Sequence, residues 1–478
     1  MSYSITNELS QAKQLTSESK FKEAIKVLNK LEAKKGLTLQ DQLEIHHLKS
    51  FLLIELGDIN EALKYAELAY KESLQFKNEF KIVDVLFTMR KALVMDGREN
   101  KVLETIIKAE KILNTINQKS SLEFKEKIAY LELNKSRYYF DTGDFNRSLI
   151  HADKALAITK EIKNQKLMMF ISRLFALNYA LKGNFNRAYE YGKRYLTLAS
   201  KINDKNEIIA ALYLIGWNFV EKGDFGQALG YLEQSLSMCD EIDSWWKLPI
   251  LTHLCELYLN INSLEKAEKC LIQMKKFKDH TDFNVLNSFY RLAEAMILKR
   301  KPQESDHLKA KQILKKIVDE EPPFAALLYP ALLELCDLYL KDLYETHNLK
   351  VLDKIHVIIS KLTSIAENQL SFWFLVEVLL LEAKLKLITF EFKEALILLN
   401  QALNVAEKYG LTRLIKRITN EQADLSKNFI RWEKMKISGA NISERMDLAR
   451  IDEQIRILLR KRNYLKKVAD QTHSVIKI

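Results

Sequence analysis

The sequence predicts an all-α protein built from repeated helical hairpins, and three observations support that prediction. A short sequence phrase recurs along most of the chain at intervals close to 40 residues. Glycine and proline, which sheets and loop-rich folds need at their turns, number only 12 and 5 among 478 residues. Hydrophobic residues make up 47% of the chain, which is enough apolar surface to build a core. Because single cores rarely grow beyond about 250–300 residues, we expect stacked units that each pack on their neighbours.

The recurring phrase has a defined order of residue types. A small turn residue comes first, followed by a polar residue, an aromatic or aliphatic residue, two variable positions, a small residue, and usually Leu or Tyr. The interval between successive turns is 40 residues from Gly143 to Gly183 and from Gly183 to Gly223, and 39 from Gly223 to Asn262. A fixed period of this length predicts one helical hairpin per repeat. Clear copies span residues 57–63, 143–149, 183–189 and 223–229, and weaker copies begin at Ser19, Gly97, Asn262 and Phe390.

Each position of the phrase has a physical role, which is clearest in the copy that begins at Gly223. Gly223 is expected to end a helix, because a left-handed C-cap conformation costs least without a Cβ. Asp224 can cap the next helix by accepting a backbone N–H. Phe225 is expected to anchor the turn in the core, and Ala228 allows two helix backbones to approach closely. The preceding helix has its own small residue where the pair crosses, and the predicted crossing residues are Gly216, Ser50, Ser136, Ala176, Cys255 and Ala383.

This pattern resembles the tetratricopeptide repeat (TPR). In that family, a small residue in the first helix is followed by an aromatic or aliphatic residue, Gly-Asp at the turn and Ala in the second helix. Gly216, Phe219, Gly223-Asp224 and Ala228 occupy those positions here, and the match covers most of residues 5–410. The period is longer than the family's usual 34 or so residues, and the proline that often closes a family repeat is absent. The resemblance implies a right-handed superhelix, or α-solenoid, of about ten hairpins with a C-terminal helical cap.

The chain is predicted to have three parts. Residues 1–278 form a regular array, residues 279–410 form irregular hairpins, and residues 411–478 form basic capping helices. Prolines end or begin helices, so Pro302, Pro322-Pro323 and Pro330 predict a bend within 279–330. After Gly410 we expect a helix over 412–436 and a final helix from Asn441 or Ser443 to about 471, which would cover the last apolar face. The predicted hairpins span 3–35, 39–77, 79–117, 121–163, 164–203, 204–243, 244–278, 283–321, 323–367 and 369–409.

Motifs of catalysis and metal binding are missing from the sequence. It has no GxxxxGK[ST] phosphate loop, HExxH or GxSxG motif. Adjacent His46 and His47 point to different faces of a helix, and Cys255 near His253 already fills a packing position. We therefore predict a protein that is not an enzyme and needs no metal or cofactor. No transmembrane run or secretory signal is seen, and the four cysteines show no close pairing, which indicates a cytoplasmic location.

Groove residues can be carried over from the TPR family. There, the first helix of each unit lines the concave side, and residues three before and one after the small crossing residue face inward. Arg137, Arg173, Tyr213 and Trp217 then form a basic–aromatic set, since Arg can clamp a carboxylate and aromatic residues dominate many interfaces. In the alternative interpretation, the aromatic residues pack between repeats and the arginines face water. The full set of groove candidates is His47, Phe51, Arg137, Arg173, Tyr213 and Trp217.

Positive charge is concentrated after residue 410. Residues 411–478 contain 16 Lys and Arg against 8 Asp and Glu, which is eight of the chain's eleven net positive charges. This excess indicates either a solvated face of the cap or a site for nucleic acid, a membrane surface or an acidic protein. No aromatic ladder or base-reading motif accompanies it, which argues against nucleic acid. The densest basic positions are Arg456, Arg460, Lys461, Arg462, Lys466 and Lys467.

The sequence as a whole predicts a protein-interaction scaffold or adaptor that binds a peptide or protein segment, with acidic groups, in the concave groove. Two alternatives remain. In the first, the array is a signal-sensing regulatory arm that works with a separate effector. In the second, the protein binds nucleic acid or an anionic surface through the basic C-terminal helices.

Overall fold

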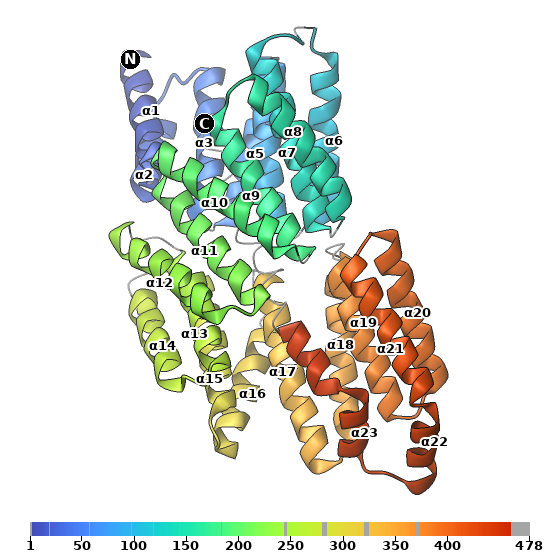
Figure 1. Ribbon diagram of the computed structural model, residues 1–478. Helices are drawn as coiled ribbons and strands as arrows, with labels where there is room; N and C mark the ends of the chain where they lie inside the picture. The colour runs from blue at the N-terminus through green and yellow to red at the C-terminus, as the bar shows by residue number, and fades with distance from the viewer. Residues whose placement is uncertain are drawn as a thin grey trace. The chain divides into compact units, whose positions relative to one another are not determined.

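A computed structural model shows helices joined by short turns, with no strand in the part of the chain that it describes (Figure 1). Within the described residues, the first twenty helices follow one another as ten pairs, so the predicted all-α repeat fold of about ten hairpins is confirmed. The described residues are 2–18, 20–56, 58–96, 98–117, 119–142, 144–182, 184–242, 246–279, 284–319, 325–368 and 372–459.

The chain divides into two compact units, which we describe separately. Of the described residues, unit 1 comprises 2–138 and 150–171, and unit 2 comprises 139–149 and 172–459. The predicted division at residues 278 and 410 stays a prediction. The helices that begin in unit 1 are α1 (Ser2–Ser17), α2 (Phe21–Glu32), α3 (Leu39–Leu56), α4 (Ile59–Phe76), α5 (Glu79–Met95), α6 (Glu99–Thr115), α7 (Leu122–Asp141) and α9 (Gln165–Leu181).

Unit 2 holds the remaining helices, and the helix α8 (Phe145–Glu161) begins in it and continues into unit 1. None of the described helices is long and apolar enough to cross a membrane. The helices of unit 2 are α10 (Phe185–Ile202), α11 (Lys205–Lys222), α12 (Phe225–Ile242), α13 (Lys247–Asn260), α14 (Leu264–Asp279), α15 (Asn284–Arg300), α16 (Glu304–Asp319), α17 (Ala325–Thr346), α18 (Lys350–Asn368), α19 (Phe372–Ile388), α20 (Phe392–Lys408), α21 (Thr412–Lys427), α22 (Phe429–Ser438) and α23 (Ile442–Ala449).

The turns of the hairpins are built as the phrase predicts. Gly223 has a φ of 86°, the left-handed conformation that ends α11, and Asn262 takes the same conformation at a weaker copy with a φ of 57°. The other turn glycines, Gly57, Gly97, Gly143 and Gly183, lie outside the described residues. The capping prediction is confirmed, because the side chains of Asp58, Asp144, Asn184 and Asp224 each accept the backbone N–H three residues later, at 2.9–3.3 Å.

Small residues occupy the crossing points of the helix pairs. A Cβ placed on Gly216 of α11 would lie 2.9 Å from Cγ of Leu232 in α12, so the two backbones are as close as the repeat requires. The hydroxyl of Ser50 in α3 donates to the carbonyl of Ala62 in α4 at 2.9 Å, which fixes an equivalent crossing. The predicted crossing residues Ser136, Ala176, Cys255 and Ala383 are all buried.

The helices after Gly410 are shorter than predicted. The expected helix over 412–436 breaks at Asn428 into α21 and α22, and the expected final helix breaks at Arg450, whose φ is 53°. Residues 451–459 then continue as a helical segment. Asn441 does cap α23, by accepting the N–H of Glu444 at 2.9 Å.

The C-terminal helices also pack differently from a simple cap. Helix α21 packs on α20, and α22 packs on α21, whereas α23 turns back to pack on α17 and α19. Helix α23 buries Ile442, Met446 and Ala449, and Lys384 of α19 donates to its terminal carbonyl at Ala449 over 2.8 Å.

The prolines around residue 300 are only partly explained by the rule that they end or begin helices. Pro302 lies in the turn between α15 and α16, as expected, but Pro330 lies inside α17 and neither begins nor ends it. Pro322 and Pro323 lie outside the described residues. The bend over 279–330 stays a prediction.

Candidate partner-binding surface

The groove candidates of unit 1 are buried side chains with partners inside the protein. His47 in α3 lies 2.8 Å from the hydroxyl of Thr88 in α5, and burial lowers the pKa of His47 to about 4. Phe51, one turn later in α3, has the ammonium of Lys91 at 4.9 Å from its ring centroid. Arg137 in α7 is buried as well, and His47 is the most exposed of the three at 6%.

The groove candidates of unit 2 are equally buried. Arg173 in α9 lies 3.4 Å from the carboxylate of Glu207 in α11, which also accepts the hydroxyl hydrogen bond of Tyr195 in α10. Tyr213 in α11 lies with its hydroxyl 2.8 Å from Nδ1 of His253 in α13. Trp217, in the same helix, is only 1% exposed.

These positions favour part of the alternative interpretation. Tyr213 packs between repeats, as that interpretation expects. Arg137 and Arg173, which the same interpretation places in water, are buried instead. The positional rule therefore finds side chains that face neighbouring helices, and it does not by itself find an open contact surface. Whether the groove candidates bind a partner remains a prediction.

Only one residue of the predicted basic run lies in the described part of the chain. Arg456 is paired with Asp452 at 2.7 Å on the segment 451–459. Arg460, Lys461, Arg462, Lys466 and Lys467 lie outside the described residues.

An open cavity of about 420 Å³ lies on the first helices of three successive hairpins in unit 2. It brings together Glu256 of α13, Lys299 of α15, and Glu334, Asp337 and Lys341 of α17. Lys299 forms ion pairs with Glu334 and, at 2.5 Å, with Asp337. Apolar side chains share the wall with these charges, among them Leu259, Met296 and Leu338. A cavity with this mixture can hold a chain segment that carries both charged and apolar groups.

The sequence pattern indicates one wall of this cavity and misses the others. Glu256 follows the small crossing residue Cys255, so the positional rule places it on the inner side of its helix. The hairpins of α15 and α17 lack the recurring phrase. The rule counts from a crossing residue that is located from that phrase, so it could not place Lys299 or Lys341. Their positions follow only from the packing of α15 on α13 and on α17.

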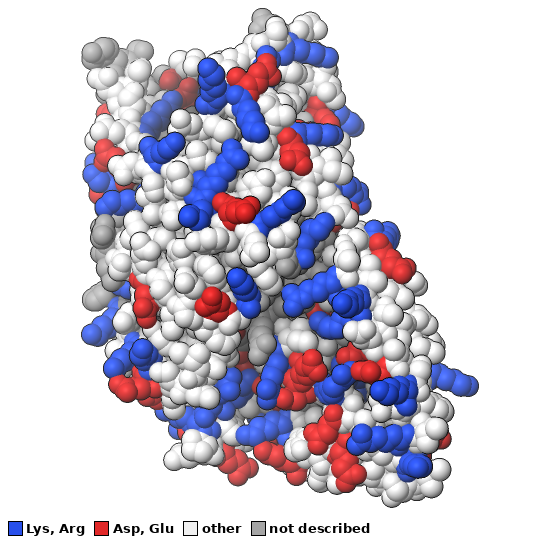
Figure 2. All heavy atoms as spheres, in the orientation of Figure 1, with Lys and Arg blue, Asp and Glu red and all other residues white. Residues whose placement is uncertain are grey.

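A second cavity, of about 300 Å³, lies between α19, α21 and the segment 451–459. Lys384 of α19, one position after the crossing residue Ala383, pairs with Glu421 of α21 at 2.9 Å. Burial lowers the pKa of Lys384, and Glu421 opposes that shift. Arg450 pairs with Asp424 at 2.6 Å. On the face that Figure 2 shows, Lys and Arg as well as Asp and Glu lie over the C-terminal helices.

The described part of the chain shows no group that points to a metal site. No three or more His, Cys, Asp or Glu side chains within it are placed to hold an ion. The four cysteines are buried and not bonded to one another. The side chain of His253 lies against Tyr213 and, at 2.9 Å, against the carbonyl of Pro249.

Comparison with known proteins identifies the repeat. The tetratricopeptide repeat family model matches residues 167–241, which span α9 to α12. A crystal structure of a Rap protein complexed with competence and sporulation factor is 15% identical and covers 77% of this chain and 100% of its own, with a TM-score of 0.53. The apo form of the quorum sensor NprR from B. thuringiensis is 15% identical and covers 75% and 98%, with a TM-score of 0.47. No curated protein sequence matches.

At these identities, the likeness to solved structures concerns the fold. The family match falls on the copies of the phrase in which Gly183 and Gly223 stand at the turns, where the sequence pattern is also clearest. Side-chain caps at Asp58 and Asp144 and small crossing residues such as Ser50, Cys255 and Ala383 repeat parts of this construction in other hairpins, and the succession of helix pairs continues through the described residues. Residues 167–241 are therefore a tetratricopeptide-repeat segment, and the helix pairs on either side of it continue the same type of helical-repeat fold.

Proposed function

We propose that this protein is an interaction scaffold that binds a peptide or protein segment on the inner side of its first helices. The observation that carries the proposal is the cavity on α13, α15 and α17, where three successive first helices present charged and apolar side chains together. Such a wall suits an extended or helical segment, because apolar contacts supply binding energy and charges fix the register. The proposal gives the chain no catalytic step, no cofactor and a cytoplasmic location.

The fold supports a protein or peptide partner. The Rap protein that shares this fold was solved in complex with competence and sporulation factor. In the proposal, the inner helices are shaped by the buried set His47, Phe51, Arg137, Arg173, Tyr213 and Trp217, and the partner segment carries acidic groups. A regulatory arm that acts through a separate effector would use the same surface.

A second candidate function is supported by α22. Ile430 and Ile437 are 71% and 85% exposed on this helix, and Arg431 and Lys434 are exposed beside them. Exposed aliphatic side chains among basic ones are typical of a helix that lies on an anionic surface. Binding of the full chain to vesicles that contain anionic lipid, lost in the double variant Ile430→Ser/Ile437→Ser, would support this function. No binding by the unaltered chain at low salt would exclude it.

The experiment for the main proposal compares charge reversal on the inner and outer sides. The double variant Glu256→Lys/Lys341→Glu inverts two cavity charges, and Lys269→Glu reverses an exposed charge on α14, the second helix of its hairpin. We expect affinity capture to lose the partner with the cavity variant and to retain it with the control. Unchanged recovery with the cavity variant would contradict the proposal.

A further inference from the structure

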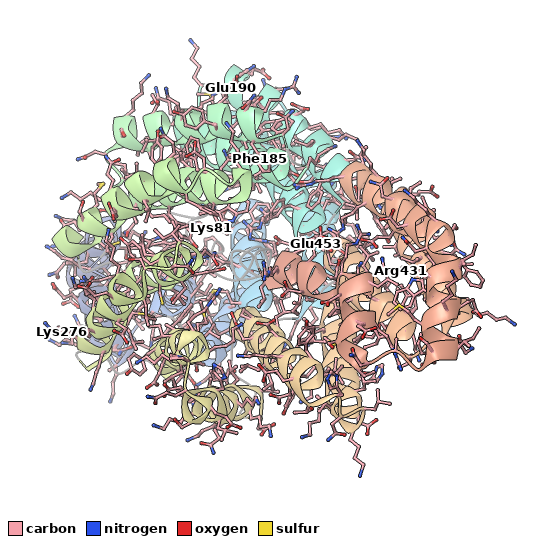
Figure 3. The ribbon with its side chains drawn as sticks, turned by 60° about the horizontal axis from the view of Figure 1, so that its bottom comes forward. Lys81, Phe185, Glu190, Lys276, Arg431 and Glu453 are labelled. Atoms are coloured by element: carbon pink, nitrogen blue, oxygen red, sulfur yellow. The ribbon has the colours of Figure 1, made fainter. Side chains whose placement is uncertain are left out.

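The segment 451–459 is an amphipathic helix that buries one whole face against its own chain. Ile451, Gln454, Ile455 and Leu458 are at most 2% exposed, whereas Asp452, Glu453 and Arg456 are exposed. The buried positions follow the i, i+3, i+4, i+7 spacing of one helix face. In Figure 3, Glu453 lies on this segment inside the C-terminal helices of unit 2, while Lys276 of α14 lies at the outer edge of the unit.

The surface that receives this face is polar as well as apolar. Glu377, in the middle of α19, is fully buried, and Arg417 of α21 holds its carboxylate with both terminal nitrogens, one of them at 2.9 Å. Gln454 completes the network. Its amide donates to the Glu377 carboxylate at 3.1 Å and to the Glu377 backbone carbonyl at 2.9 Å, and its side-chain oxygen accepts from Arg417 at 3.0 Å.

This network has two parts, the ion pair between the repeat helices and the hydrogen bonds that Gln454 of the segment 451–459 adds to it. The Glu377–Arg417 pair joins two repeat helices and needs no help from the segment, since a two-nitrogen clamp already satisfies the carboxylate. Gln454 is neutral and adds hydrogen bonds to a pair that is complete without it. The receiving surface can therefore exist when the segment is absent, and an amide at this position is what it recognises.

The segment reaches this surface through a defined hinge. Arg450 leaves the helical conformation between α23 and the segment, and it pairs with Glu421 and Asp424 of α21. On the other side, Asp452 and Arg456 stand at the edge of the cavity on α13, α15 and α17. The segment thus lies on the inner side of the last hairpins, against Lys384, the residue that the family position rule assigns to the groove.

We propose that α17, α19 and α21 form a helix-binding groove, that residues 451–459 are its resident occupant, and that a partner helix with the same pattern binds there by displacing them. The partner carries aliphatic residues at i, i+4 and i+7 and an amide side chain at i+3. An amphipathic helix in a groove is a recurring mode of peptide recognition. This inference rests on the proposed function, for which it names the partner chemistry and a form of regulation.

Tethering decides how strongly the resident segment competes. A segment joined by a short linker acts at an effective concentration on the order of 1 mM, so an external helix binds weakly until the segment is released. Weakening the segment alone should therefore raise the apparent affinity for an added helix, while the groove stays intact.

The test uses the full chain and a fluorescent peptide of residues 449–459, with binding read by fluorescence anisotropy. Gln454→Glu sets a carboxylate against Glu377 and releases the segment without altering a repeat helix, and Ile455→Asp releases it by a different route. We expect both variants to bind the peptide at least about tenfold more tightly than the unaltered chain. Arg456→Gln, at an exposed position of the segment, should bind as the unaltered chain does. A peptide that carries Ile455→Asp should bind none of them.

Hydrogen exchange of residues 451–459 shows whether each variant has released the segment, and circular dichroism shows that the array remains folded. A released, folded variant that fails to bind the peptide overturns the inference. If at the same time Glu256→Lys/Lys341→Glu still abolishes partner recovery, the proposed function stands and only this groove is lost. If the peptide binds as expected but the cavity variant recovers as much partner as the unaltered chain, the groove is supported and the proposed function is contradicted.

Discussion

The side-chain amide of Gln454 donates to both the carboxylate and the backbone carbonyl of Glu377, a residue 77 positions earlier in the chain. This contact joins the last described helical segment to the first helix of the tenth hairpin. It buries a polar group from the C-terminal region on the inner side of the repeats, where a simple cap would have covered the outer end. The charge pair behind it determines the first prediction.

Removal of Arg417 should destabilise the last hairpins strongly. Arg417→Met leaves the buried carboxylate of Glu377 without its counter-charge, and the breaking of a buried pair from one side costs about 3–5 kcal/mol. The double variant Arg417→Met/Glu377→Leu removes both charges and should recover most of that loss. Local unfolding free energies of α19 from hydrogen exchange measure the difference. Equal stability of the single and double variants would contradict the buried-pair argument.

Two glycines in one hairpin should respond to alanine in opposite ways. A Cβ on Gly216 would lie 2.9 Å from Leu232 and 3.2 Å from Cβ of Tyr231, so Gly216→Ala should cost about 1–3 kcal/mol. Gly230, in the facing helix α12, has no atom within 4 Å of such a Cβ. Gly230→Ala should therefore stabilise the hairpin by about 0.5–1 kcal/mol, because alanine favours helix. Urea unfolding of the two variants gives the comparison, and the same sign for both would refute the close crossing.

Protonation of His47 should destabilise the protein in mildly acidic solution. Burial lowers the pKa of His47 from 6.5 to about 4. Between these values the unfolded chain binds a proton that the folded chain does not, so the free energy of unfolding rises with pH and is lost as pH falls from about 6.5 to about 4. The loss is on the order of 3 kcal/mol.

The control for this prediction is the variant His47→Gln, whose side chain can still donate to Thr88 but does not titrate. Unfolding free energies of the variant and the unaltered protein, measured across this pH range, isolate the contribution of His47 from that of the carboxylates. Parallel curves for the two proteins would show that the histidine does not stay neutral in the folded state.

Local chemistry made the hairpins predictable from sequence. Asp224 next to Gly223 specifies a cap and a turn within a few residues, and Gly216 specifies a crossing through its lack of a side chain. Each feature depends on neighbours at fixed spacing, so one sequence is enough to find it. The fold class and the ten hairpins follow from the repetition of these features.

The functional surface was less predictable, because it depends on contacts between distant repeats. The partnership of Gln454 with Glu377 has no local signature, and Arg450, where the final helix breaks, is a residue of good helix propensity. Burial of Arg173 likewise follows from Glu207 and Tyr195, which lie on later helices. The positional rule uses only the spacing from a crossing residue, so it could not distinguish a buried side chain from an open one.

Site-specific photo-cross-linking tests the central claim, that a protein segment binds on the inner side of the first helices. A photoreactive residue is placed at Glu256 or Lys341 on the cavity wall, and at Ile272 of α14 or Val357 of α18, exposed positions on second helices. The account predicts that, in an extract of the source cells, the two cavity positions cross-link to one and the same protein and the two control positions do not. Cross-linking of that protein from α14 or α18, with none from the cavity positions, would contradict it.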